Sequence, residues 1–356
     1  MRTIHALQQT SRTAVLIGLL VIGGTWQTSM RSRGFEQAPE AQAGAFCSST
    51  AASLFRACGF EAQDEYWKAV AKCTNVSETQ ERAQCLTEAR SARDEANQLC
   101  QQQHIGRLNA CQLLGENRHD PEFEPAAFDS NFRHLTNPNR YFPLTIGNRW
   151  EYRSGNEVDT VEVLNQTKRI DEVTCIVVRD LVSKAGRLAE ATDDWFAQAK
   201  DGNVWYCGEE VKDYETFAGD RPRVPELVSI DGSFKAGRNG DKPGIIFLAS
   251  PARDDVYLEE FSLGNAEDVT EILSVTYKFG AEPELDRLVP RALVSIFCHG
   301  DCVVTKNYSL LEPGVFARKY YAPGVGVILE VELTEGKVVQ LTNCNFDGRC
   351  GNLPKP

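Results

Sequence analysis

From Tyr141 onward, the chain consists of short segments in which apolar and polar residues alternate. This period of two predicts strands that bury one face, and Asp201-Gly202 and Glu335-Gly336 are typical of hairpin turns between strands. No ten-residue helical stretch interrupts them, although a turn is expected near Ala281–Arg287. About a dozen strands joined by short turns predict an antiparallel meander, closed into a barrel or curled round a core. The predicted strands are Arg149–Arg153, Asp159–Thr167, Thr174–Val182, Asp194–Ala199, Val204–Glu210, Gly244–Ala249, Val256–Phe261, Thr270–Tyr277, Leu293–Phe297, Val303–Ser309, Val315–Tyr321, Gly326–Glu332 and Lys337–Leu341.

The first six cysteines follow a different, helical pattern. Their spacings of 11, 15, 12, 15 and 11 residues form a palindrome. Because residues that face each other in an antiparallel hairpin have a constant index sum, the outermost cysteines should pair with each other and the innermost likewise. At 100° per residue these spacings keep the three cysteines of each arm on one stripe of its helix. The same sum places Ala62 opposite Ala96, so that the helices can approach closely. The predicted disulfides are Cys47–Cys111, Cys58–Cys100 and Cys73–Cys85.

The two ends of this hairpin carry their own signals. The turn is predicted at residues 74–77, where Ser77 and Gln80 have the spacing of a helix-capping box. Gly115 lies where a C-terminal cap glycine is expected. We therefore predict a rigid, disulfide-stapled helical hairpin within residues 44–115.

The other six cysteines are predicted to form local disulfides. An even number of cysteines in an exported chain is typical of disulfides. The chain has no Cys-x-x-Cys pair and only five histidines, and the Cys298–Cys302 segment is the sole, disfavoured candidate for zinc. We expect no metal and no cofactor. The predicted pairs are Cys175–Cys207 across neighbouring strands, Cys298–Cys302 and Cys344–Cys350.

Residues 1–43 are predicted to be an export segment or signal peptide. Arg2 and Arg12 precede the short apolar run Ala14–Gly24, which is too short to span a bilayer comfortably. Cleavage after Ala41-Gln42-Ala43, cleavage near Thr25–Ser29 and an uncleaved anchor all stay open. We expect a secreted or periplasmic protein with no transmembrane span in the mature chain.

The remaining chain divides into an acidic linker, residues 116–140, and an antiparallel β domain, residues 141–356, giving an α+β protein. The linker is expected to pack on a neighbour through Phe123, Phe128 and Phe132. The formal net charge is −12, and without residues 1–43 the 34 basic and 48 acidic side chains give −14. A surface of this sign repels nucleic acid and anionic lipid headgroups, so nucleic acid is not an expected partner.

The β domain contains the motifs Tyr141-Phe142-Pro143-Leu144, Gly147-Asn148-Arg149-Trp150-Glu151-Tyr152, Asp193-Asp194-Trp195-Phe196-Ala197-Gln198, Asp201-Gly202-Asn203-Val204-Trp205-Tyr206, Ala266-Glu267-Asp268 and Tyr320-Tyr321-Ala322-Pro323-Gly324-Val325-Gly326. These motifs resemble those of an uncharacterised family of exported bacterial proteins. The resemblance covers about residues 141–342. It implies an exported protein and supplies no catalytic residues to carry over. The strand pattern is also similar to that of lipoprotein-carrier half-barrels, which implies a concave sheet that can hold acyl chains.

No recognised catalytic motif accompanies these segments. The acidic pairs, such as Asp193-Asp194, would put at most one carboxylate inward, because neighbouring residues on a strand point to opposite faces. We therefore predict no catalytic residues. The Asp301 and Asp347 loops could ligate calcium, although turn formation is the favoured interpretation. The candidate ligand-binding residues are Trp195, Trp205 and Tyr206, with core packing as the alternative.

Our first hypothesis is a non-enzymatic exported protein whose β domain holds an apolar or amphiphilic ligand, such as a lipid, or an envelope protein, while the hairpin acts as a brace. The alternatives are an exported hydrolase with inward-facing carboxylates and a purely structural surface module. A buried acid pair in a wet cleft would favour the hydrolase, and a dry, aromatic-lined concavity would favour binding.

Overall fold

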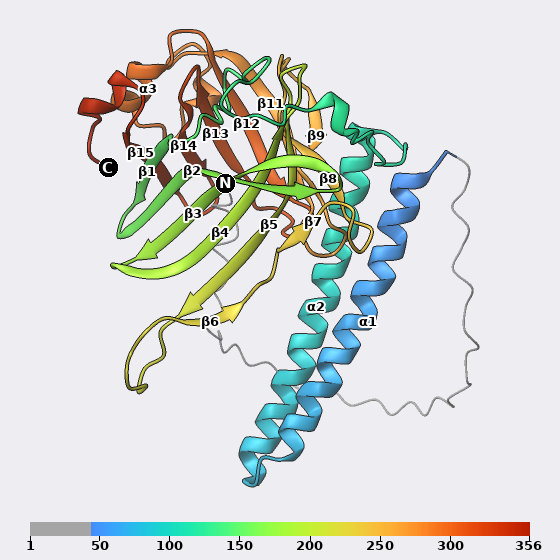
Figure 1. Ribbon diagram of the computed structural model, residues 1–356. Helices are drawn as coiled ribbons and strands as arrows, with labels where there is room; N and C mark the ends of the chain where they lie inside the picture. The colour runs from blue at the N-terminus through green and yellow to red at the C-terminus, as the bar shows by residue number, and fades with distance from the viewer. Residues whose placement is uncertain (1–43) are drawn as a thin grey trace.

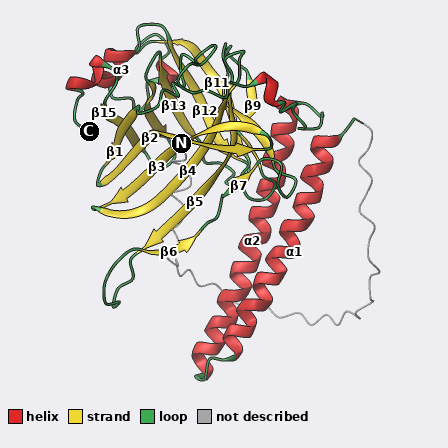
Figure 2. Ribbon diagram, in the orientation of Figure 1, coloured by secondary structure: helices red, strands yellow, loops and turns green. Residues whose placement is uncertain are grey.

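Two long antiparallel helices project from a strongly curved β-sheet (Figures 1 and 2). The computed structural model describes residues 44–356, and the predicted export segment lies outside them. The helices are α1 (Phe46–Thr74) and α2 (Thr79–Leu114), which lie within the segment predicted to be a hairpin. Together with the antiparallel sheet they confirm the α+β class.

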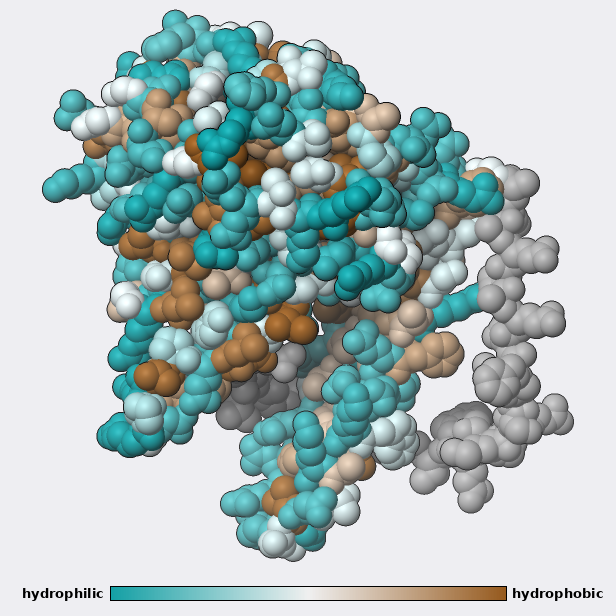
Figure 3. Space-filling view, in the orientation of Figure 1, coloured by the Kyte–Doolittle hydropathy of each residue, from teal (hydrophilic) through white to brown (hydrophobic). Residues whose placement is uncertain are grey.

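The hairpin contains the three predicted disulfides. The paired cysteines have Cα–Cα distances of 5.7 Å for Cys47–Cys111, 5.7 Å for Cys58–Cys100 and 5.5 Å for Cys73–Cys85. Small residues such as Ala62 and Ala89 are buried along the seam. The surface of the hairpin is mostly hydrophilic in the view of Figure 3. With so little apolar area between the helices, the disulfides supply much of the restraint, since each contributes about 2–4 kcal/mol.

The helix ends differ from the prediction at one point. The N-cap of α2 is Glu78, whose carboxylate accepts the backbone N–H of Glu81 at 2.8 Å, so the expected Ser77 cap is wrong. Glu78 is the residue with extended backbone geometry, and the N-cap position requires that geometry. At the other end, Gly115 has φ 87° and its N–H donates to the carbonyl of Cys111, which confirms the predicted cap.

The described residues contain fifteen strands and one short third helix. The strands are β1 (Arg149–Ser154), β2 (Glu157–Ile170), β3 (Val173–Lys184), β4 (Arg187–Gln198), β5 (Val204–Glu215), β6 (Glu226–Ser229), β7 (Phe234–Lys235), β8 (Lys242–Phe247), β9 (Val256–Leu258), β10 (Glu260–Phe261), β11 (Asp268–Tyr277), β12 (Cys302–Ser309), β13 (Ala317–Ala322), β14 (Gly326–Glu332) and β15 (Lys337–Cys344). The third helix is α3 (Arg291–Phe297), and 3-10 turns occur at η2 (Pro125–Ala127), η3 (Pro283–Leu285) and η4 (Gly348–Asn352).

The strands form a sheet that closes almost completely on itself. Its order is β10-β8-β5-β4-β3-β2-β1-β15-β14-β13-β12-β11-β9, with β6 and β7 attached to β5. The first strand of this path is β10, which pairs with β8, and the last is β9, which pairs with β11. Because β9 and β10 follow each other in the chain, the two ends of the path lie close together. Gly244 makes this closure possible, since a Cβ there would lie 2.2 Å from the carbonyl oxygen of Glu259. The sheet is therefore a nearly closed barrel, more closed than a half-barrel.

The prediction of a strand at Leu293–Phe297 is wrong, because these residues belong to α3. Leu293, Val294 and Phe297 are buried at a helical spacing, and a short apolar run is compatible with either structure. The short strands β6 and β7 were not predicted. The turn expected near Ala281–Arg287 contains η3.

The linker crosses the barrel rather than hanging free. Phe128 and Phe132 are each 5% exposed, and Phe123 packs against Phe128 with ring centroids 4.8 Å apart. Phe128 also forms an antiparallel bridge with Ala199. The expected packing through the three phenylalanines is confirmed.

The hairpin docks on the outside of the barrel near the seam between β9 and β11. Arg107 forms a two-point ion pair with Glu267, and the Gln103 amide donates to the carbonyl of Leu311 at 2.9 Å. Ala110 packs with Val269 and other apolar residues of the barrel wall. Only the upper part of α2 makes these contacts, and the turn end of the hairpin projects well away from the barrel (Figure 1). Among the described helices, none is long and apolar enough to cross a bilayer.

Candidate functional site

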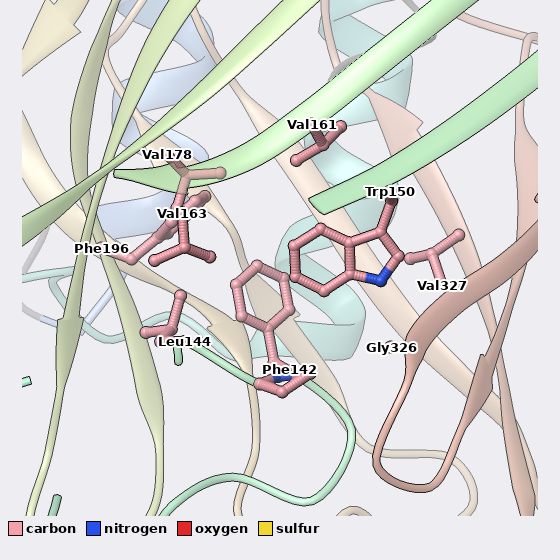
Figure 4. A pocket seen from close by; sticks show the side chains of 10 residues that line it. Phe142, Leu144, Trp150, Val161, Val163, Val178, Phe196, Gly326 and Val327 are labelled. Atoms are coloured by element: carbon pink, nitrogen blue, oxygen red, sulfur yellow. The ribbon is translucent and has the colours of Figure 1, made fainter. Parts of the chain in front are cut away.

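One zone of the barrel interior, the apolar zone, is a packed set of hydrophobic side chains. The strands alternate, so that every second residue points inward. Trp150 is buried here and its indole N–H donates to the carbonyl of Val325 at 2.8 Å. The free space among these side chains is about 20 Å³, enough for one or two water molecules. The zone is lined by Phe142, Pro143, Leu144, Trp150, Val161, Val163, Val178, Phe196, Gly326 and Val327 (Figure 4).

The interior changes from apolar to acidic two residues further along the same strand faces. On β2 the inward residue two positions before Val161 is Asp159, and on the antiparallel β3 the inward residue two positions after Val178 is Asp180. We call the resulting group the acidic belt. Its members, all less than a tenth exposed, are Asp159, Asp180, Glu190, Asp194, Glu209, Glu259, Lys319 and Glu330. The belt as defined thus contains seven carboxyl groups and one lysine.

Asp159 and Asp180 form a hydrogen-bonded carboxyl pair. The register pairs Asp159 with Val182 and Asp180 with Val161, so the two acids are diagonal neighbours on the inner face. Burial raises the pKa of Asp159 to about 6. Burial, and then the charge of Asp159, raise the pKa of Asp180 well above its ordinary value. The pair therefore holds a proton that an exposed pair would lose.

Each of these two acids also keeps one free oxygen. Neither Asp159 Oδ1 nor Asp180 Oδ1 has a hydrogen-bond partner in the part of the chain that the structure describes. Nearer the strand ends, by contrast, Glu157 is neutralised by Lys337 at 3.0 Å and by Lys184 at 3.6 Å. Among the described residues, lysines form ion pairs with Glu157 beside the belt, and none forms an ion pair with Asp159 or Asp180.

The other side of the belt is a hydrogen-bonded network on β11, β12 and β13. Glu259 accepts the side-chain amide of Asn307 at 2.7 Å and the hydroxyl of Thr270. Burial raises the pKa of Glu259. Burial alone would lower the pKa of Lys319, but the nearby Glu259 and Glu330 raise it overall. Lys319 therefore stays charged and partly neutralises the acids on this side of the belt.

Tyrosine rings stand among the acids. The Tyr152 hydroxyl donates to the carbonyl of Val327 at 3.0 Å, and the Tyr206 hydroxyl bonds Asp194. Burial raises the pKa of Tyr152, Tyr257 and Tyr321 well above the ordinary value. These phenols therefore stay neutral. Aromatic rings beside carboxylates form an environment that can bind a cation.

The three candidate ligand-binding residues do not share one cavity. Tyr206 points inward and stacks on Phe196 with centroids 4.9 Å apart. Trp195 and Trp205 lie on the outer face, in a cluster with Phe128. Residues 205 and 206 are adjacent on one strand and so point to opposite faces. A ligand role for each of the three stays a prediction.

The acid pair of the interior was missed from the sequence. We considered adjacent acids, and the structure shows their expected division: Asp194 faces inward, while Asp193 faces outward and pairs with Arg179 at 2.8 Å. Asp159 and Asp180 are far apart in sequence and meet only through strand register. One signal was present, because Asp159 continues the inward alternation of Val161 and Val163 on β2.

The three further predicted disulfides are all present, with one difference in their setting. Cys175 and Cys207 lie on β3 and β5, which are separated by β4, and not on neighbouring strands. Their Cα atoms are 6.8 Å apart, and Cys207 lies at the register shift of the β4–β5 pair, between Tyr206, which pairs with Phe196, and Gly208, which pairs with Trp195. Cys298–Cys302 and Cys344–Cys350 close local loops, as predicted.

The two loops weighed for calcium use their carboxylates for other contacts. Asp347 accepts two hydrogen bonds from the Arg349 guanidinium, at 3.0 and 2.8 Å. Asp301 lies 3.4 Å from Arg140 and accepts the backbone N–H of His299 at 3.2 Å. Within residues 44–356 no group of three or more His, Cys, Asp or Glu side chains is arranged to hold a metal ion.

Comparison with known proteins adds little to this geometry. No family model matches the chain, and no curated protein matches it. Two solved structures align with it: a protein from Parabacteroides distasonis provisionally named a lipoprotein (11% identity, TM-score 0.28) and a protein from Bacteroides fragilis provisionally named an exported protein with a YmcC-like fold (12% identity, TM-score 0.30). Each alignment covers 58% of this chain and 99% of the other. At these TM-scores the superposition is too loose to carry a conclusion about function.

The six disulfides themselves indicate a protein that folds outside the reducing cytoplasm.

Proposed function

We propose that this is a secreted or periplasmic binding protein whose barrel receives an amine-bearing ligand at the acidic belt. The observation that carries the proposal is the carboxyl pair of Asp159 and Asp180, buried and short of cations. Buried carboxylates are costly unless they are paired, and Asp159 and Asp180 each keep one oxygen without a hydrogen-bond partner in the described residues. A ligand ammonium between the free oxygens would provide the missing charge and hydrogen bonds.

The apolar zone limits the form of the ligand. Its free space of about 20 Å³ is too small for an acyl chain, whose CH₂ groups need more room. A wholly apolar ligand is therefore not favoured in this zone. The aromatic rings around the belt, such as Tyr152, would contact the apolar part of an amphiphilic amine. The hairpin, fixed to the wall through Arg107, would act as a brace outside the binding region.

A hydrolase is the second candidate, and the same acid pair favours it. Two carboxyl groups that share a proton can act as general acid and general base, provided that water and substrate reach them. Binding and hydrolysis make different predictions for the ligand: a binding protein releases it unchanged, whereas a hydrolase converts it.

Native mass spectrometry of the protein purified from its own envelope tests both candidates. We expect a bound ligand that is released on acidification. The released ligand should be chemically unchanged, and its mass should be that of an amine. The matched comparison is Asp159→Asn/Asp180→Asn against Asp193→Asn, whose acid faces outward. An adduct that is anionic, or one retained equally by both variants, would contradict the cation site. A cleaved product formed by the wild type and not by the Asp159→Asn/Asp180→Asn variant would favour the hydrolase.

A further inference from the structure

The outer wall of the barrel carries a cluster of cations around one tryptophan. The ammonium of Lys168 lies 3.5 Å from the centre of the Trp195 ring, and that of Lys235 lies 4.9 Å from it. Trp195 itself is only 3% exposed. This cluster lies on the opposite face of the sheet from the acidic belt and is independent of the proposed function.

The strand register brings the two lysines together from opposite sides. Lys168, near the end of β2, is paired with Cys175 on β3, which is next to β4 and Trp195. On the other side Trp195 pairs with Gly208 of β5, and Gly208 pairs with Lys235 of β7. Two lysines from strands far apart in the sheet thus extend over one indole.

Gly208 is the residue that allows this approach. Its φ of 128° is one that side chains rarely adopt, and a Cβ there would lie 2.3 Å from the carbonyl oxygen of Phe234. Without a side chain, β7 lies directly against β5 and holds Lys235 beside the ring. The backbone of the sheet therefore fixes the cluster, and flexible side chains alone do not account for it.

The acids near the cluster form their ion pairs with other cations. In the described residues no carboxylate lies within ion-pair distance of Lys168, Lys235 or Arg238, although the chain as a whole has a net charge of −12. Glu210, whose charge acts on both lysines, forms its ion pair with Lys212. Asp171 lies beside Gly237 and makes no ion pair with the cluster. Burial, and then the charges of Lys168 and Arg238, lower the pKa of Lys235, as expected for a crowded ammonium.

We propose that Lys168 and Lys235 form a binding site for a phosphate or sulfate group, with Trp195 as its floor. Two ammonium groups over one ring are matched by a multivalent oxyanion, which accepts several charge-assisted hydrogen bonds at once. A soluble phosphate ester and a phospholipid headgroup share this chemistry. An ammonium between the lysines would be repelled, so the ligand class differs in sign from that of the barrel interior.

Protection of the lysines from acetylation tests the site. The full chain is treated with limiting acetylating reagent at neutral pH, with and without inorganic phosphate, and each lysine is quantified by mass spectrometry. We expect phosphate to slow the modification of Lys168 and Lys235 several-fold, and to leave Lys242, an exposed lysine paired with Asp120, unchanged. Equal rates with phosphate and with chloride at the same ionic strength would overturn the proposal.

A binding measurement with two ligand sources completes the test. Glucose 1-phosphate and vesicles containing phosphatidylglycerol are offered to the wild type, to Lys168→Gln/Lys235→Gln and to the control Lys242→Gln. Binding of the soluble ester alone identifies a soluble phosphate ligand, and binding of the vesicles identifies a lipid headgroup; both require loss in the double variant and retention in the control. Binding of neither, or equal binding by the double variant, would contradict the site. Unchanged thermal unfolding of the double variant excludes a folding defect as the cause of any loss.

Discussion

Arg107 of the hairpin and Glu267 of the barrel wall form a buried two-point ion pair. Arg107 Nε lies 2.7 Å from one carboxylate oxygen of Glu267 and Nη2 lies 2.9 Å from the other. The side chains are 6% and 3% exposed. The backbone carbonyl of Asp268, next in sequence to Glu267, accepts a hydrogen bond from the backbone N–H of Glu259 at 2.8 Å. The hairpin is therefore anchored beside a member of the acidic belt.

Breaking this ion pair should release the hairpin from the barrel. Arg107→Met leaves Glu267 buried without its cation. We expect it to lower the free energy that holds the hairpin on the barrel by about 3–5 kcal/mol. Arg93→Met, which removes a more exposed pair with Asp94, should cost about 0–1 kcal/mol. Hydrogen exchange of α2 near Ala110 would detect the release. Equal effects of the two variants would show that the pair does not hold the hairpin.

Removing the central staple should loosen the projecting half of the hairpin. Cys58→Ala/Cys100→Ala is expected to lose about 2–4 kcal/mol of local stability, because the helices share little apolar area. The helical circular-dichroism signal should then fall at a lower temperature, while the barrel melts as before. The matched control is Cys344→Ala/Cys350→Ala, which opens only a small C-terminal loop. A hairpin that melts unchanged without its staple would refute this role.

The acid pair should make the ligand-free protein more stable as the pH falls through about 6. The pKa of Asp159 is raised to about 6 and that of Asp180 is raised well above its ordinary value. Stability linked to a raised pKa is fully present below the unfolded value and is lost as the pH rises through the folded value. Thermal unfolding of Asp180→Asn should therefore depend less on pH than that of Asp193→Asn. Identical slopes for the two variants would count against a buried proton.

The closure of the barrel should depend on Gly244. A Cβ there would lie 2.2 Å from the Glu259 carbonyl, so Gly244→Ala must separate β8 from the segment at 259. We expect a loss of about 1–3 kcal/mol of unfolding free energy. Gly351→Ala, where the added Cβ meets nothing within 4 Å, should be nearly neutral, and chemical denaturation would compare the two.

The hairpin was predictable in detail because cysteine is an explicit marker of contact. The pairing of Cys58 with Cys100 follows from one index sum and helical phase, without knowledge of the rest of the fold. The interior of the barrel was less predictable. Asp159 meets Asp180 through a register that includes a shift between Val163 and Thr167, and no local residue pattern marks that shift.

The same limit explains the other differences. The run Leu293–Phe297 is too short for its period to separate helix from strand, so α3 was predicted as a strand. Trp195 and Trp205 are marked as aromatic by the sequence, but their position on the outer face depends on which residues the sheet turns inward.

The ligand charge is tested most directly by a calorimetric titration with octylamine and, separately, with octanoate. The two have the same chain length and opposite charges, so that any difference between them reports the sign of the site. We expect heat of binding from octylamine with the wild type and with Asp193→Asn, little from octanoate, and loss of the octylamine signal in Asp159→Asn/Asp180→Asn. Octanoate binding as tight as octylamine binding, or unchanged octylamine binding by that double variant, would contradict an acidic belt that receives an amine.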